Sequence, residues 1–333
     1  ALPAPSGAML DTADHLRLRW IVNSTTWRPG VDEFAFVLTI LPTHEREEVT
    51  RFHRFEDRKR ALLSRLMQRA AIKRACASAE DARWRDARVE ALDVRRTKGS
   101  KPFHGARASV AGAPNFNYNV SHEGDYVVLA SETHAVVGVD VAAPGQVRRV
   151  TGGGGAERDV GKLLETFSSV LTDRERASIA GVAARDGERA GEELFRKHWS
   201  LKEAHVKAIG VGLGMDLRRC EFDIDAARST ASVSVDGKSR NDWSFHMQAF
   251  PPIVDDAVNE DRHWITVSRG PVEDIVDADG EFTETTFSRR DFSKDEWSAI
   301  LAAPAPSFEL LTVGDLIPID SKDAFEAAGG VIF

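Results

Sequence analysis

The 333-residue sequence predicts an α+β protein, made of two similar α/β subdomains followed by a C-terminal extension. Segments 43–79 and 188–209 have the composition and length of helices. Each accompanies short segments rich in β-branched and aromatic residues, which are typical of strands. The order therefore runs helix and strand, then helix and strand again, without an obvious sequence repeat. We expect boundaries that give 1–135, 136–270 and 271–333.

Composition indicates a soluble globular protein of a reducing, cytoplasmic compartment. Hydrophobic residues make up 42% and charged residues 29%, which is ordinary for such proteins, and no apolar stretch is long enough to cross a bilayer. The N-terminal residues lack the pattern of a secretory signal, and Cys76 and Cys220 form no CxxC pair. The net charge of -8 argues against a dedicated nucleic-acid binder. We expect neither nucleic acid nor membrane as a partner.

Apolar runs separated by turn residues predict the elements of the first half. Residues 15–40 predict a strand, an Arg-Pro-Gly turn, and then a helix or a second strand. Few helix breakers occur in 43–79, which predicts one long helix or two. Segment 87–103 predicts a strand that runs into a basic loop. Segment 114–132 predicts a turn followed by a strand at 126–131.

The second half begins with a short valine-rich segment at 134–144, which predicts a buried strand interrupted by one aspartate. The Gly-rich stretch 144–160 predicts a plain loop, because it lacks the Lys-Ser/Thr that completes a P-loop. Helices are expected at 160–181 and 188–209. The acidic tail from 271 is expected either to wrap the body or to be partly disordered. Further strands are expected at 220–225, 231–237, 243–250 and 263–270.

Two clusters contain carboxylates that are candidates for metal binding or catalysis. Asp140 interrupts the apolar strand VGVDV, and a buried carboxylate is costly unless it is paired or binds a metal. Capping of the next loop is the plainer alternative. Glu203 and Lys207, within 195–214, are four residues apart and share a helix face. A surface ion pair, or a capping box from Ser200 to Glu203, explains this pair but not the density of functional residue types around it.

Two further clusters contain polar residues suited to binding. Ser121 and His122 lie in NVSHEGD, but neighbours on a strand point to opposite faces and no GxSxG elbow is present, so a hydrolase dyad is disfavoured. A structural histidine is the alternative there. The basic loop RRTKGSKP suits a phosphate, because arginine grips it bidentately and lysine adds charge; an exposed basic turn is the alternative. Its basic residues are Arg95, Arg96, Lys98 and Lys101.

Arginine and lysine are also concentrated between residues 46 and 74. This concentration fits a solvated helix face. It equally fits a surface that meets phosphates or an acidic protein partner.

Taken in order, the four clusters resemble the 4′-phosphopantetheinyl transferase superfamily. The resemblance is to the monomeric, two-halved type, specifically the eukaryotic aminoadipate-semialdehyde dehydrogenase phosphopantetheinyl transferases. It covers roughly 20–225, and more weakly extends to about 269. The combination of NVSH, GVDV and WSLKEAxxKAIGxGL is highly specific, although each motif alone is weak. The other matching stretches are TTWRP, RFHRFEDRKRALLSRLMQR, RRTKGSKP and EFDI.

The resemblance implies two halves related by a pseudo-twofold axis, with coenzyme A in the cleft between them and Mg²⁺ on its pyrophosphate. Asp140 and Glu203 would be the metal ligands, which suits the preference of Mg²⁺ for carboxylate oxygens. Lys207 would contact the pyrophosphate and offset charge on the leaving group. The implied nucleotide-binding residues are Arg96, Lys98, Lys101, Asn119, Val120, Ser121 and His122, with Arg51 as a further phosphate contact of uncertain register.

One position departs from the pattern of bacterial members, which carry a second acid where this chain has Ala142. Eukaryotic relatives also carry a non-acidic residue there, so activity is not in question. Water or Glu123 would complete the metal site. The preference between Mg²⁺ and Mn²⁺ stays open.

The implied reaction transfers phosphopantetheine from coenzyme A to a serine of an apo acyl or peptidyl carrier protein and releases 3′,5′-ADP. Glu203, directly or through a water, would take the serine proton. The carrier is expected to be acidic and the enzyme monomeric. Fatty acid synthase, aminoadipate reductase of lysine biosynthesis, and polyketide or peptide synthetases are all possible carriers.

Two alternatives belong to other functional classes. A metal-dependent phosphohydrolase would use Asp140 and Glu203 on a nucleotide diphosphate. A non-enzymatic module would bind nucleic acid or acidic proteins through 46–74, but this reading leaves VGVDV and WSLKEA unexplained.

Overall fold

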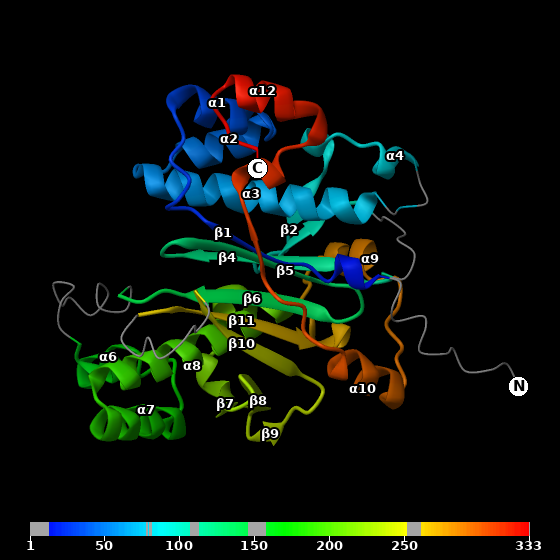
Figure 1. Cartoon of the computed structure of the whole chain (residues 1–333). Coiled ribbons are helices and arrows are strands. Elements are labelled where there is room, and N and C mark those ends of the chain that lie inside the picture. The colour runs from blue at the N-terminus through cyan, green and yellow to red at the C-terminus, as the bar shows by residue number, and fades with distance from the viewer. Residues whose placement is uncertain are drawn as a thin grey trace, which may run out of the picture.

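Two sheets face each other at the centre of the protein, each covered on its outer face by a long helix (Figure 1). The computed structural model describes residues 13–77, 79, 82–106, 113–145, 158–251 and 261–332. Helices and strands are both abundant, which confirms the α+β class. No helix in these ranges combines the length and the apolar composition that crossing a membrane requires.

The first sheet has the strand order β12-β1-β5-β4. Its strands are antiparallel except for β12, which pairs in parallel with β1. The 22-residue helix α3 packs on β4 and β5 and supplies much of the core on that side. The bounds are β1 Arg19–Asn23, β4 Asn117–Glu123, β5 Tyr126–Glu132, β12 Glu309–Leu311, α1 Val31–Thr39, α2 Thr43–Thr50, α3 Phe55–Cys76 and α4 Ala82–Arg85.

The second sheet has the order β6-β11-β10-β8-β7, with the short β9 paired to β8. Helix α8 packs on β6 and β11, and α7 packs beside α8. The bounds are β6 Val136–Ala142, β7 Cys220–Asp225, β8 Thr230–Val235, β9 Lys238–Ser239, β10 Ser244–Phe250, β11 His263–Gly270, α6 Val160–Thr166, α7 Asp173–Asp186 and α8 Glu188–Ile209. A small hairpin of β2 Val94–Arg96 and β3 Pro102–His104 stands apart from both sheets.

The C-terminal extension wraps both halves, which settles the two alternatives for the tail. Its chain runs from α10, beside the second sheet, up to α12 near α1 (Figure 1). On the way, β12 adds an edge strand to the first sheet. The bounds are α9 Glu281–Thr286, α10 Lys294–Ala302, α11 Val313–Leu316 and α12 Lys322–Ala327.

Most predicted segments form helices or strands as expected, but some contain a different number of these elements than predicted. Segment 15–40 contains a strand followed by a helix, and 43–79 contains two helices. The helix expected at 160–181 is two, α6 and α7, and the basic loop of 87–103 joins two strands rather than following one. The Gly-rich stretch at 152–155 lies outside the described residues.

The prediction of a turn before residue 126 was wrong for 117–123, which forms β4. The segment is rich in asparagine, a residue usually found in turns. Here the buried side chains of Asn117 and Asn119 serve a different purpose, because they bind the backbone of the neighbouring sheet.

A ladder of side chains from β4 joins the edge strands of the two sheets. The Oδ1 of Asn117 accepts from the N–H of Val137 at 3.0 Å, and the Oδ1 of Asn119 accepts from the N–H of Val139 at 2.9 Å. Glu123 accepts from the N–H of Ala143, just beyond the end of β6. Alternate residues of a strand share one face, so this face of β4 supplies the hydrogen bonds that an exposed edge of β6 would lack.

Replacing Asn117 with Ala should destabilise the protein through this ladder. The change leaves the N–H of Val137 and the carbonyl of Ala135 without the partners they have now. We expect a loss of about 2–4 kcal/mol in the free energy of unfolding, measured by urea denaturation. The exposed Asn241→Ala is the control and should change stability by less than ~0.5 kcal/mol. Equal effects of the two variants would show that the ladder contributes little.

Acid should destabilise the contact between the β4–β5 turn and β11. The Nε2 of buried His263 accepts from the N–H of Asp125 at 3.3 Å, and burial lowers the pKa of His263 to about 4. The unfolded chain, with an ordinary histidine pKa, then binds a proton first as the pH falls. Stability is therefore lost between about pH 6.5 and 4, by up to ~3 kcal/mol from this group. His263→Gln should flatten that part of the pH profile, and an unchanged slope would contradict the assignment.

Candidate active site

Helix α8 lies directly against the backbone of β6 because residue 138 is glycine. A Cβ at Gly138 would lie 2.0 Å from the carbonyl oxygen of Ala204 and 2.5 Å from the amide nitrogen of Ala208. Any larger residue would push the helix away. The glycine of the GVDV motif thus sets how closely Glu203 and Lys207 approach Asp140.

Asp140, Lys207 and Ser121 form one hydrogen-bonded group. The Nζ of Lys207 lies 2.6 Å from the Oδ1 of Asp140 and 3.0 Å from the Oγ of Ser121. Ser121 in turn donates to the same Oδ1 at 3.1 Å. Asp140 is 4% exposed, so it is neither a surface residue nor a cap of the following loop.

Of the predicted Glu203–Lys207 pair, Lys207 belongs to this group and Glu203 interacts with it through its charge, so the pair is not a helix cap. Helix α8 begins at Glu188, so Ser200 lies in its interior, where its Oγ donates to the carbonyl oxygen of Asp140 at 3.4 Å. That rules out the capping-box alternative.

Electrostatic interactions couple the acidic side chains of this group. Burial raises the pKa of Glu203, Lys207 lowers it, and the negative charge of Asp140 raises it again. Burial also raises the pKa of Glu123 to about 7; the N–H of Ala143 opposes this shift and Asp140 adds to it. Burial disfavours the charge of Lys207, but Asp140 and Glu203 outweigh that effect and raise its pKa. The carboxylates therefore repel one another and favour a cation between them.

One observation tests whether a metal ion fits here. The Oδ2 of Asp140 is buried and has no hydrogen-bond partner among the described residues. A buried carboxylate oxygen is costly in that state, and Glu203 is close enough to share its electrostatic field. Mg²⁺ is commonly held by one or two carboxylates, with waters and phosphate oxygens as its other ligands. Two carboxylates of this kind fit such an ion.

A ready-made cage of protein ligands is not present in the described ranges. No group of three or more His, Cys, Asp and Glu side chains there is arranged to hold a metal. Glu123 shares the field of Asp140, but one of its oxygens accepts from the backbone of Ala143.

A groove of about 610 Å³ opens beside this group. One wall is the basic loop, which packs tightly on the end of α8: a Cβ at Gly99 would lie 1.8 Å from the carbonyl oxygen of Gly210. Gly210 itself ends the helix in a left-handed conformation, with a φ of 72°. The predicted site residues that line the groove are Arg96, Lys98, Lys101, Asn119, Val120, Glu203 and Lys207.

Lys101 lines the groove, but its ammonium group forms hydrogen bonds inside the protein. It is 2% exposed, and its Nζ donates to the carbonyl oxygens of Val137 at 2.6 Å and Lys207 at 3.3 Å. Burial lowers its pKa to about 7. Lys101 therefore ties the basic loop to both β6 and α8.

The structure does not bring every predicted residue to the groove. Arg51 is exposed at the end of α2 and does not line it. His122 is exposed on β4 and does not line it either. Lys98 lines the groove but pairs with Asp279 of the extension at 3.0 Å.

Sequence reasoning missed the apolar wall of the groove. One of its side chains lies on the last turn of α8 and the others lie in the glycine-rich segment after it, where single apolar residues are a weak signal. They are Val206, Val211, Met215 and Leu217.

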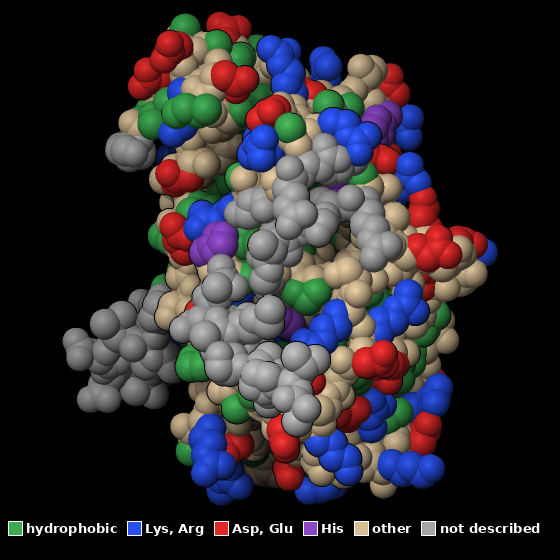
Figure 2. All heavy atoms as spheres, turned by 90° about the vertical axis from the view of Figure 1, so that its right-hand side faces the viewer, with side chains coloured by type: hydrophobic (Ala, Val, Ile, Leu, Met, Phe, Trp, Pro, Cys, Tyr) green, Lys and Arg blue, Asp and Glu red, His purple; other side chains and the backbone are tan. Residues whose placement is uncertain are grey.

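The basic segment 46–74 is less available to partners than its composition suggests. Arg69 is buried and pairs with Glu45 at 2.9 Å, and buried Lys59 donates to two backbone carbonyls. Arg65 pairs with Glu48 at 2.6 Å. On the face seen in Figure 2, Lys and Arg are interspersed with Asp and Glu, so no single charge sign dominates it.

Two family models match this chain. One describes the N-terminal part of 4′-phosphopantetheinyl transferases and matches residues 25–134, and the other describes the 4′-phosphopantetheinyl transferase superfamily and matches residues 136–267. Together they include every residue that lines the groove, but they leave out β1 and β12 of the first sheet.

Curated relatives of this chain are also named phosphopantetheinyl transferases. An L-aminoadipate-semialdehyde dehydrogenase-phosphopantetheinyl transferase of Mus musculus is 30% identical over 238 residues, which are 68% of this chain and 69% of the relative. The protein of that name from Xenopus laevis is 28% identical over 290 residues, 85% and 87% of the two chains. A phosphopantetheinyl transferase of a Thraustochytrium species is 31% identical over 251 residues, 75% and 77% of the two chains.

Replacing Lys207 with Met should destabilise the protein, because it leaves the buried carboxylate of Asp140 without its cation. We expect a loss of about 2–3 kcal/mol in the free energy of unfolding at neutral pH. The exposed Lys162→Met on α6 is the matched control, with an expected change below ~0.5 kcal/mol. Urea denaturation of both variants measures the difference. A Lys207→Met protein as stable as the wild type would mean that the ion pair is not important for the fold.

Proposed function

Because the chain belongs to the 4′-phosphopantetheinyl transferase superfamily, we propose that the groove beside Asp140 is its active site. The enzyme moves the phosphopantetheine arm of coenzyme A onto a serine of a carrier protein and releases 3′,5′-ADP. The phosphohydrolase alternative finds no support in the relatives. The observation that carries the site assignment is the buried Oδ2 of Asp140, which has no partner among the described residues and belongs to a carboxylate paired with Lys207 of the groove.

The phosphates of coenzyme A are the part that the groove suits best. Lys207 would contact the diphosphate, and Arg96 and Lys98 of the basic loop line the same groove. Release of Lys98 from Asp279 would free its ammonium group for the 3′-phosphate. Ser121 and His122 belong to the same binding region, and the apolar wall suits the uncharged parts of coenzyme A.

Asp140 and Glu203 are the residues that would hold Mg²⁺, with Glu123 as the candidate for a third carboxylate. The ion would neutralise charge on the diphosphate. Lys207 adds a second positive charge at the same place, which favours departure of the anionic 3′,5′-ADP.

Glu203 is the proposed base for the attacking serine. The serine oxygen forms a bond to the β-phosphorus of coenzyme A, and the bond from that phosphorus to the bridging oxygen of 3′,5′-ADP breaks. Glu203, directly or through a water, accepts the serine proton. Its raised pKa makes it a better base than an exposed carboxylate.

The carrier substrate is proposed from the names of the relatives and from charge. Those names associate the family type with aminoadipate-semialdehyde dehydrogenase, so a carrier domain of that enzyme, from lysine biosynthesis, is the first candidate. A carrier with an acidic recognition helix would meet the arginines near the groove. Carriers of fatty acid synthesis are the second candidate, and we propose that the enzyme acts as a cytoplasmic monomer.

Replacing Glu203 with Gln should abolish transfer, by at least ~100-fold, while coenzyme A still binds. Mass spectrometry of apo carrier proteins measures the transfer as a phosphopantetheine-sized mass gain, and calorimetry measures binding. Glu193→Gln, an exposed change on the same helix, should leave both unchanged. Wild-type turnover by the Glu203→Gln protein would refute the assigned role.

Incubation with coenzyme A but without a carrier separates the transferase from a hydrolase. We expect no release of 3′,5′-ADP beyond the uncatalysed rate. Rapid release without a carrier would favour the phosphohydrolase.

A further inference from the structure

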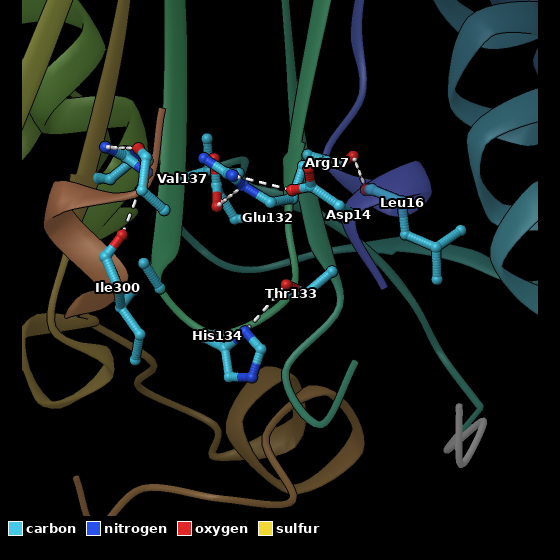
Figure 3. Close-up of polar contacts among 12 residues, drawn as sticks. Asp14, Leu16, Arg17, Glu132, Thr133, His134, Val137 and Ile300 are labelled. Atoms are coloured by element: carbon cyan, nitrogen blue, oxygen red, sulfur yellow. Dashed lines mark hydrogen bonds and ion pairs between the residues drawn. The ribbon is translucent and has the colours of Figure 1, made fainter. Parts of the chain in front are cut away.

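A buried group of arginines lies where β6 begins, at the other end of that strand from Asp140. Glu132, at the end of β5, receives hydrogen bonds from Arg17 and Arg19. Arg269 lies in register with Val137 of β6 and is 1% exposed. Figure 3 shows Arg17 turned toward Glu132 among the strands, with Asp14 beside it.

These arginines hold the C-terminal extension. Arg269 donates to the carbonyl oxygen of Leu301, at the end of α10, at 2.9 Å, and Arg17 donates to that of Pro304 at 3.0 Å. Backbone carbonyls accept hydrogen bonds from these side chains but carry no net charge, and the buried Nε of Arg269 has no partner among the described residues.

Positive charge therefore exceeds negative charge in this group. Arg17, Arg19 and Arg269 are all at least nine-tenths buried; the buried acid Glu132 pairs with Arg17 and Arg19 and acts on Arg269 only through its charge. Three positive charges and one negative charge leave a surplus of two; Asp14 is mostly exposed and compensates weakly. Burial lowers the pKa of Arg269 to about 10; Glu132 opposes that shift and Arg17 and Arg19 reinforce it. The buried group would gain stability from a further anion.

A cavity of about 180 Å³ adjoins this buried positive charge through Arg19, the one of the three arginines that lines it. Arg19, Arg228 and His246 line it from three different strands or turns, and the extension covers it with 305–308. None of the described residues that line it is acidic. Burial lowers the pKa of His246 to about 4, and Arg269 and Arg19 add to the shift, so its ring is neutral at pH 7 and can donate one N–H. The hydroxyls of Ser229 and Ser307 and the amide of Gln248 complete the polar lining.

We propose that this cavity binds a small inorganic oxyanion, phosphate or sulfate, between Arg19, Arg228 and His246. The volume is below the ~300 Å³ at which sites for drug-sized ligands begin, which favours the free ion over a nucleotide. Arg19 supplies a buried guanidinium whose position Glu132 and two backbone carbonyls already hold. An ion bound there is in contact with β1, the β7–β8 turn, β10 and the extension at once, so it stabilises the closure of the extension over both sheets.

The proposal is tested by the thermal unfolding of the full-length protein in phosphate or sulfate, against chloride at matched ionic strength. Saturating 3′,5′-ADP is present throughout, so that the coenzyme A groove is already filled. We expect Tm to rise by about 5 °C when phosphate reaches ~100 times its Kd. Arg228→Gln, which removes an exposed cation of the cavity, should remove at least half of that rise. Transferase activity without added phosphate should be unchanged.

Arg185→Gln is the matched control, because Arg185 also forms an exposed pair with an aspartate but lies on α7, away from the cavity. It should keep the full phosphate effect. Crystals grown with selenate in place of sulfate should show anomalous density in the cavity. An equal rise in Tm for Arg228→Gln and Arg185→Gln, no rise in the wild type, or an empty cavity in selenate would each overturn the proposal.

Discussion

The hydrogen bonds from β4 side chains to the backbone of β6 are the interaction on which the rest of the architecture depends. Both strands are edges of their own sheets, and two edges placed face to face would leave backbone N–H groups buried and unpaired. Asn117, Asn119 and Glu123 satisfy those groups. Ser121, the remaining member of the same strand face, meets the side chain of Asp140 instead. The contact that holds the halves together therefore also positions the proposed metal ligand.

Close backbone contacts at glycines determine the geometry of the groove. Gly138 allows α8 to lie on β6, and Gly99 allows the basic loop to lie on the end of α8. Each contact brings charges from distant parts of the sequence together, since the loop, the strand and the helix are separated by tens of residues. Lys101 reinforces both contacts by donating to the carbonyl oxygens of Val137 and Lys207.

The space between the two sheets is apolar in the middle and charged at both ends. Its centre is built from aliphatic residues of β5, β6 and β11. At one end the acids Asp140 and Glu203 favour a cation, and at the other end Arg19 and Arg269 exceed the charge of Glu132. Unbalanced buried charge is costly, so both ends are suited to a ligand of opposite sign. The extension covers the basic end and leaves the acidic end open to the groove.

The sequence by itself determined the α+β class and the type of most elements, because these follow from local composition and spacing, and its motifs singled out Asp140, Glu203 and Lys207 as candidates for the site. The tertiary structure alone decided that 117–123 is a strand, since its asparagines bind a partner that lies beyond the local sequence. It also decided that Lys101 donates to the backbone while Arg51 stays outside the groove, and that the extension joins the first sheet. Local sequence sets which residues can carry charge or form a strand, but their partners depend on which segments fold against each other.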